Sequence, residues 1–168
     1  MNSETILLLF DYNYWANARI LDAAAGLTAE QYASTVPGLG HGGLRGTLVH
    51  MLSAEFIWRQ RCLEGVSPPA LLWEADFPTL VALRERWAEE ERLMRAGLAR
   101  LTEKALAGRI AYRTTDGRAM EDTRWQLLVH VVNHGTQHRA EVAMALTALG
   151  HSPGDLDLII YLRQSASG

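Results

Sequence analysis

Apolar residues recur along most of the chain at the three- and four-residue spacing of an amphipathic α-helix. Four stretches hold this pattern long enough to predict helices, over about residues 3–26, 44–63, 77–104 and 123–149. Pro78 suits the first turn of the third helix, and Gly26 and Gly150 follow the first and the fourth as natural stops. Four such helices predict an all-α fold, a four-helix bundle.

Short polar side chains mark where these helices are expected to begin. Ser3 is a suitable N-cap for the first helix. Thr28 with Gln31, and Thr123 with Gln126, have the spacing of a capping box, in which each side chain accepts from the other residue's backbone amide. The first pair predicts a short helical turn after the first long helix, and the second pair predicts the start of the fourth.

A different pattern occupies RIAYRTTDGRAMED, between the third and fourth predicted helices. The Asp116-Gly117 pair is typical of a hairpin with a type I′ turn, which needs positive φ at both central residues. We therefore expect a small β-hairpin there. The tail DLDLIIYLRQ predicts a short element closing the bundle. No repeat or linker divides the chain, so we interpret residues 1–168 as a single domain.

Composition then excludes several classes of protein. The 168 residues are 48% hydrophobic and 21% charged, as in ordinary globular proteins, and the formal net charge of −3 disfavours a nucleic-acid partner. The chain has neither a basic leader nor an apolar run of about 18 residues, so we expect no membrane span. Its single cysteine, Cys62, permits no internal disulfide and favours the cytoplasm; we expect an inert thiol.

The stretch HVVNHGTQHRAEV spaces three histidines four residues apart, which raises the question of a metal site. The outer pair, His130 and His138, would be about 12 Å apart along a helix, so at most two neighbours can share one ion. His138 falls within the apolar stripe of this helix and His134 at its edge, whereas His130 lies roughly 110° from its centre. We therefore predict His134 and His138 as ligands.

Two imidazoles leave an ion under-coordinated, so a third ligand is required from another element. His50 is the best candidate, because its neighbours one turn away are small, Gly46 and Ala54. Considered alone, His50 would be interpreted as a core histidine. Because His134 and His138 are expected to face inward, we instead interpret His50 as a metal ligand. His41 and His151 are interpreted as surface or capping residues.

Two established metal chemistries do not fit these motifs. HGTQH has Gly135 where zinc proteases place a glutamate base. The sequence also lacks the E-x-x-H pairs that are typical of di-iron centres. Glu141 shares roughly the face of His134 and is a candidate for orienting a ligand or acting as a base, with a solvent-facing salt bridge as the alternative. Glu55 is expected to point away and to form such a salt bridge. Asn133 and Arg139 are expected to face loops or a partner chain.

Three blocks, DYNYWANARILDAA, LVHMLSAEFIWRQRCLEG and HVVNHGTQHRAEV, together resemble the DinB/YfiT-like proteins over nearly the whole chain. The resemblance implies a bundle of up-down-down-up connectivity and one divalent metal ion, nickel, zinc or iron, held by three histidines. The ligands carried over are His50, His134 and His138, and the last two are the pair that helical phase also favours. The resemblance further implies a homodimer and, in some relatives, chemistry on low-molecular-weight thiols such as bacillithiol or mycothiol.

Two functions follow as hypotheses. The first is a metal-dependent enzyme, a thiol-dependent S-transferase or a hydrolase, acting on a small molecule that the sequence does not identify. Three neutral imidazoles leave coordination positions open for water or substrate, as in catalytic sites. The second is a non-catalytic, metal-stabilised binding or stress-response module.

Overall fold

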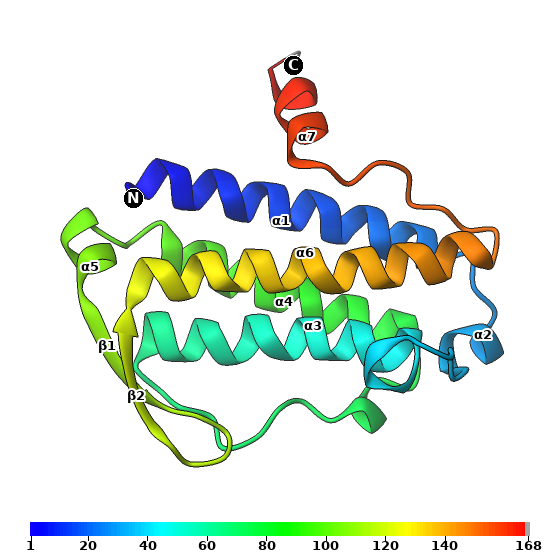
Figure 1. Ribbon diagram of the computed structural model, residues 1–168, viewed down its shortest axis with the longest axis horizontal. Coiled ribbons are helices and arrows are strands. Elements are labelled where there is room, and N and C mark those ends of the chain that lie inside the picture. The colour runs from blue at the N-terminus through cyan, green and yellow to red at the C-terminus, as the bar shows by residue number, and fades with distance from the viewer. Residues whose placement is uncertain (167–168) are drawn as a thin grey trace.

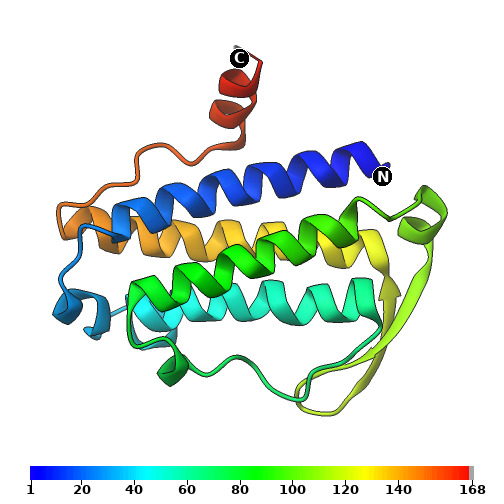
Figure 2. The same cartoon turned by 180° about the vertical axis from the view of Figure 1, so that it is seen from behind.

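The computed structural model describes residues 1–166, and most of this part of the chain is helical. Its long helices are α1 (Ser3–Ala24), α3 (Leu44–Arg59), α4 (Leu80–Leu98) and α6 (Arg124–Ala148). They lie side by side with roughly aligned axes (Figure 1), and the view from behind shows α4 beside α1 and α3 (Figure 2). The shorter elements are α2 (Ala29–Ala33), α5 (Glu103–Ala107), α7 (Leu158–Ser165), β1 (Arg109–Arg113) and β2 (Ala119–Thr123).

Two clusters of buried apolar side chains fill the space between the long helices. One gathers near α2 and includes Leu48 and Leu52 of α3, and the other gathers near the hairpin and includes Leu128 of α6. These leucines are fully buried, which stabilises the fold by about 1.5–3 kcal/mol each relative to exposure. Along α1 the first cluster begins at Ile20, after the buried polar residue Asn17.

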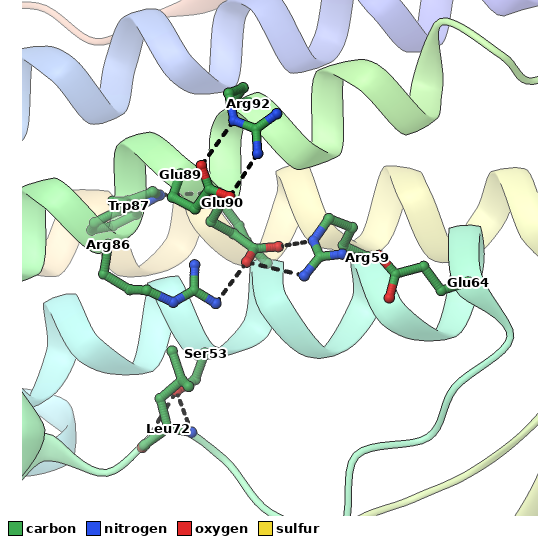
Figure 3. A network of polar contacts seen from close by, with 10 residues as sticks. Ser53, Arg59, Glu64, Leu72, Arg86, Trp87, Glu89, Glu90 and Arg92 are labelled. Atoms are coloured by element: carbon green, nitrogen blue, oxygen red, sulfur yellow. Dashed lines mark hydrogen bonds and ion pairs between the residues drawn. The ribbon is translucent and has the colours of Figure 1, made fainter.

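A buried ion pair joins α3 to α4. The Glu90 carboxylate is completely buried and accepts hydrogen bonds from Arg59 Nε, from Arg59 Nη2 at 3.3 Å and from Arg86 Nη2 at 2.9 Å. Figure 3 shows Glu90 between the two guanidinium groups, while the neighbouring Glu89 turns outward to Arg92. Buried charges need such partners, so this contact fixes how the two helices pack.

The predicted helix starts are partly confirmed. Thr28 and Gln31 form the expected capping box at α2. The cap of α1 is Asn2 rather than Ser3, because Asn2 Oδ1 accepts from the backbone amide of Thr5 at 2.9 Å and the Ser3 hydroxyl instead donates to the Leu101 carbonyl.

The expected capping box at α6 is wrong. Thr123 is the N-cap residue but makes no side-chain capping bond. It is also the last residue of β2, paired with Arg109 of β1, and the next amide, that of Arg124, donates to the Gly108 carbonyl. The carbonyl that precedes the hairpin therefore accepts from the amide of Arg124, not from the Gln126 amide that the capping box would have bound.

The third predicted helix is divided in the structure. It begins at Leu80, capped by Thr79, so Pro78 precedes the helix instead of occupying its first turn. It ends at Leu98, and Thr102 then caps α5 by accepting from the amide of Ala105 at 3.2 Å. This second cap lets the chain turn toward the hairpin, which a continuous helix to residue 104 would not allow.

The β-hairpin is confirmed, with β1 and β2 antiparallel and Arg113 paired with Ala119. Its turn is not type I′, because Asp116 lacks the positive φ that this turn requires. The Gly117 amide bonds to the Thr114 carbonyl at 2.9 Å and Gly117 has φ 86°, so a turn followed by a left-handed glycine closes the loop.

The C-terminal tail forms α7, which follows an extended segment and stands against α1 (Figure 1). None of its residues is fully buried. Tyr161 packs against Tyr12 and Trp15, and the Tyr12 hydroxyl donates to the Leu156 carbonyl at 2.9 Å. Within residues 1–166, no helix combines the length and apolar composition of a membrane crossing.

Candidate metal centre

A cluster of histidines lies where α3 packs against α6. His50 of α3 and His134 of α6 place their Nε2 atoms 3.0 Å apart. The His138 ring lies 4.5 Å from that of His134 and 4.8 Å from that of His50, measured between ring centroids. The rings of the three histidines predicted as ligands therefore lie close together, although His50 is 84 residues from His134 in the sequence.

Helical phase separates the three histidines of α6. His138 is buried, His134 is half-buried and His130 is exposed. The His130 ring packs edge-on against Trp58, with centroids 5.4 Å apart, and lies 5.7 Å from that of His134. Whether His130 stays outside the coordination sphere remains a prediction.

His41 is a member of the cluster that sequence reasoning missed. It is exposed, as expected of a surface residue, but its ring stacks on that of His50 with centroids 3.7 Å apart and planes at 16°. His41, His50 and His138 each offer a ligand atom, and these atoms lie within 4.8 Å of one another. Glycines on both sides of His41 were the available signal, because they permit the left-handed backbone that brings this side chain back over α3.

Glu141 orients one of the rings. Its Oε2 lies 2.9 Å from His138 Nδ1, three residues earlier on α6, so the alternative of a solvent-facing salt bridge is wrong. An Nδ1–H that donates to this carboxylate leaves the Nε2 lone pair of His138 free to bind an ion. Partial burial raises the pKa of Glu141, but the hydrogen bond and charge interaction with His138, together with Gln137 and His41, outweigh it and the pKa is lower than usual.

The environment keeps the central imidazoles neutral. Burial, followed by the neighbouring histidines, lowers the pKa of His50 from 6.5 to about 4, and the same causes lower that of His134 to about 4. Burial also lowers the pKa of His41 and of His130. Near neutral pH these rings therefore carry lone pairs, the form that binds metal ions.

The same shifts predict how acid affects the metal-free protein. Between pH 6.5 and about 4, the unfolded chain binds protons at His50 and His134 that the folded protein does not. The free energy of unfolding should therefore fall as pH falls through this window. Urea unfolding at pH 7 and pH 4.5 measures the loss. A double variant, His50→Gln with His134→Gln, should lose less, and an equal loss would show that these residues are not responsible.

The donor set fits a transition-metal ion. Two imidazole nitrogens bound to one ion at about 2.0–2.1 Å lie about 2.9–3.3 Å apart for angles of about 90–110°. The 3.0 Å between Nε2 of His50 and Nε2 of His134 falls in this range. Imidazole ligands suit zinc, nickel, copper and iron better than magnesium or calcium. The residues present can therefore hold such an ion.

A buried polar network supports α6 beneath the cluster, and it corrects the expectation for Glu55. Glu55 is 4% exposed instead of solvent-facing. Its Oε1 accepts from the amide groups of Asn13 at 2.9 Å and Asn17 at 2.8 Å, and its Oε2 accepts from Trp87 Nε1 at 3.0 Å. Burial raises the pKa of Glu55, and these hydrogen bonds oppose the rise.

Arg139 is also buried, at 1% exposure, so the expectation that it faces a loop or a partner chain is wrong. Its Nη1 donates to the carbonyl oxygens of Asn13 and Asn17, the latter at 2.9 Å. Each asparagine therefore turns its oxygen to Arg139 and its nitrogen to Glu55, the only orientation that suits both charges. Asn133, by contrast, is exposed.

Gly135 explains how this arginine fits. A Cβ on Gly135 would lie 2.7 Å from Arg139 Nη1 and 2.9 Å from Asn13 Oδ1. Gly135 stands where the zinc-protease motif has glutamate. The side chains of Arg139 and Asn13 occupy the space that a side chain at this position would need. The network connects α1, α3, α4 and α6, and α6 is also the helix that carries His134 and His138.

Neither Cys62 nor the larger cavity adds chemistry to this centre. Burial raises the pKa of Cys62 to about 12, so the thiol stays protonated at neutral pH, as expected of an inert cysteine. A cavity of about 520 Å³ lies between α1, α2 and the start of α4, with mainly apolar walls and no histidine. A smaller one of about 220 Å³ borders the histidine cluster through His41 and His50.

Comparison with known proteins agrees with this arrangement. The chain is similar to Protein DinB of Bacillus subtilis (strain 168), with 25% identity over 168 residues that cover 95% of each chain. The sequence profile of the DinB family matches residues 1–167. The match spans α1, α3 and α6, which carry the three blocks on which the resemblance rested. The chain therefore belongs to the DinB family.

Proposed function

We propose that this protein binds one divalent transition-metal ion, nickel, zinc or iron, through His50, His134 and His138, and that the centre is catalytic. The observation that carries the proposal is the convergence of these imidazoles from two helices, with the Nε2 atoms of His50 and His134 3.0 Å apart. Three imidazoles, of which His50 and His134 have their pKa lowered to about 4, match the ligand set of catalytic zinc sites, which keep a position for water or substrate.

The reaction class that we propose is thiol-dependent S-transfer or hydrolysis of a small molecule. Bound metal would supply Lewis-acid polarisation or a lowered pKa for bound water or thiol. The chain's own residues would supply the rest: Glu141 holds His138 in one tautomer and is the candidate base. The Glu55–Arg139 network keeps α6 in register with α3.

The proposal includes the up-down-down-up bundle that the DinB/YfiT resemblance implies. It is supported by the colour gradient of Figure 1, in which α1 and α6 run one way and α3 and α4 the other. A homodimer and a cytoplasmic location also belong to the proposal. Exposed apolar side chains on α1 and α7, Leu7, Leu8 and Ile159, would be available to a second copy.

The test is metal analysis of protein purified without chelator. We expect about one transition-metal ion per chain in the wild type and near-complete loss in His50→Ala, because the remaining histidines of α6 do not complete a site alone. His151→Ala, which removes a histidine outside the cluster, should retain the ion. A wild-type protein that stays metal-free after reconstitution with nickel, zinc or iron would contradict the proposal.

A second function, the non-catalytic metal-stabilised module, is favoured by one observation. With His41 the cluster contains enough imidazoles to close a tetrahedral site, and closed sites are typically structural. Small thiols distinguish the two functions, since they should perturb the visible spectrum of a cobalt-substituted open site and leave that of a permanently closed site unchanged.

A further inference from the structure

His41 is carried by a loop built around glycines. Gly40, Gly42 and Gly43 flank it, and within the described residues it is the one non-glycine residue with positive φ, at 55°. An antiparallel bridge between Thr35 and Gly43 closes the base of the loop. The Thr47 hydroxyl lies 2.7 Å from the Gly40 carbonyl and 2.8 Å from that of Gly43, which ties the loop to α3.

The backbone of this loop rests directly on α3. A Cβ on Gly46 would lie only 1.9 Å from the His41 carbonyl oxygen. Gly46 precedes His50 by one helical turn, so the close approach places the His41 ring over the His50 ring. A left-handed conformation is unfavourable for a residue with a Cβ, and the loop contacts hold His41 in it.

We propose that His41 is a fourth, displaceable ligand of the metal ion, one that leaves the ion when substrate binds. This inference rests on the proposed function. Its ligand atom lies within 4.8 Å of those of His50 and His138. The stacked ring must tilt for its lone pair to converge with that of His50, since the two planes are only 16° from parallel. A ring on an exposed loop can make that movement, whereas the rings fixed on α3 and α6 cannot.

The position of His41 also explains why it would be the ligand that leaves. His138 is buried and bonded to Glu141, and His50 and His134 lie on long helices. His41 is exposed and borders the cavity of about 220 Å³, which Ser53, Leu72 and Glu74 also line. A small molecule entering this cavity reaches the ion from the side that His41 covers. Displacement frees one coordination position and leaves three histidines on the ion.

Cobalt(II) titration of four proteins tests the proposal: the wild type, His41→Ala, Gly46→Ala and the control His151→Ala. Binding is measured by competition with a chelator, and the visible absorption spectrum reports the ligand set. We expect His41→Ala to bind cobalt about 10-fold more weakly or worse, with a changed spectrum that added imidazole restores. His151→Ala should match the wild type.

Two further measurements separate a displaceable ligand from a fixed one. Gly46→Ala changes no donor atom but pushes the His41 backbone away, so its affinity and spectrum should shift toward those of His41→Ala. Added 2-mercaptoethanol should perturb the cobalt spectrum of His41→Ala at a several-fold lower concentration than that of the wild type, because no imidazole competes with it.

The outcomes distinguish this inference from the proposed function. A wild type that binds no cobalt overturns the metal centre itself. Wild-type affinity and spectrum in His41→Ala, beside loss of binding in His50→Ala, overturn the fourth ligand while the centre stands. A thiol response that is equal in His41→Ala and the wild type overturns the displacement, as does a Gly46→Ala protein indistinguishable from the wild type.

Discussion

Replacing Arg139 by methionine is expected to lower the free energy of unfolding by about 3–5 kcal/mol. Methionine fills much of the same volume but has no donors and no charge. The carbonyl oxygens of Asn13 and Asn17 would lose their partner, and the Glu55 carboxylate would lose the positive charge that faces it across the two asparagines. When a buried polar group loses its hydrogen-bond partner, its desolvation is no longer compensated and the folded state is destabilised.

Urea unfolding at fixed pH, in the presence of a chelator, measures this loss without any contribution from bound metal. The matched control is Arg92→Met, which removes an exposed arginine that pairs with Glu89 three residues away on α4. That change should have a far smaller effect on the free energy of unfolding, because this ion pair is exposed to solvent. If Arg139→Met were as mild as the control, the network would not be a structural element of the fold.

Replacing Glu90 by alanine is expected to have an effect of similar size, a loss of about 3–5 kcal/mol. Glu90 is fully buried and is the carboxylate that Arg59 and Arg86 share. Without it, the buried Arg59 guanidinium keeps only Glu64, whose side chain is 45% exposed. The uncompensated charge between α3 and α4 would destabilise the packing that Figure 3 shows.

The neighbouring residue provides the control. Glu89→Ala removes a carboxylate that is 48% exposed and bonded to Arg92, so we expect a far smaller change in the free energy of unfolding. Both variants place alanine in α4, which leaves helix propensity equal between them. Equal destabilisation by the two substitutions would contradict the role assigned to the buried pair.

The helices could be predicted from the sequence because apolar spacing reports directly which face of each helix is buried. The same phase argument singled out His134 and His138 and left His130 outside, whereas His50 was chosen for its small neighbours, Gly46 and Ala54. Boundaries were less predictable where two local signals competed. Thr123, for example, has the right spacing for a capping box but is held in the hairpin instead.

The failures concern polar residues whose partners lie on other helices. A helical wheel places Glu55 and Arg139 off the apolar stripe and therefore in solvent. In the structure these residues are buried because Asn13 and Asn17 of α1 lie between them and satisfy both. His41 was missed for a related reason: its contact with His50 depends on a left-handed backbone and on the missing Cβ of Gly46, which spacing alone does not reveal.

The distance along the chain between the two halves of the histidine cluster has a consequence for biogenesis. His134 follows His50 by 84 residues, and all of α4, the hairpin and the first part of α6 come between them. During synthesis the first half of the cluster exists long before the second. The proposed ion would be captured by the full set only after α6 has docked on α3, so its binding would be a late event that follows assembly of the helices. The binding free energy would then add to the global stability of the finished fold.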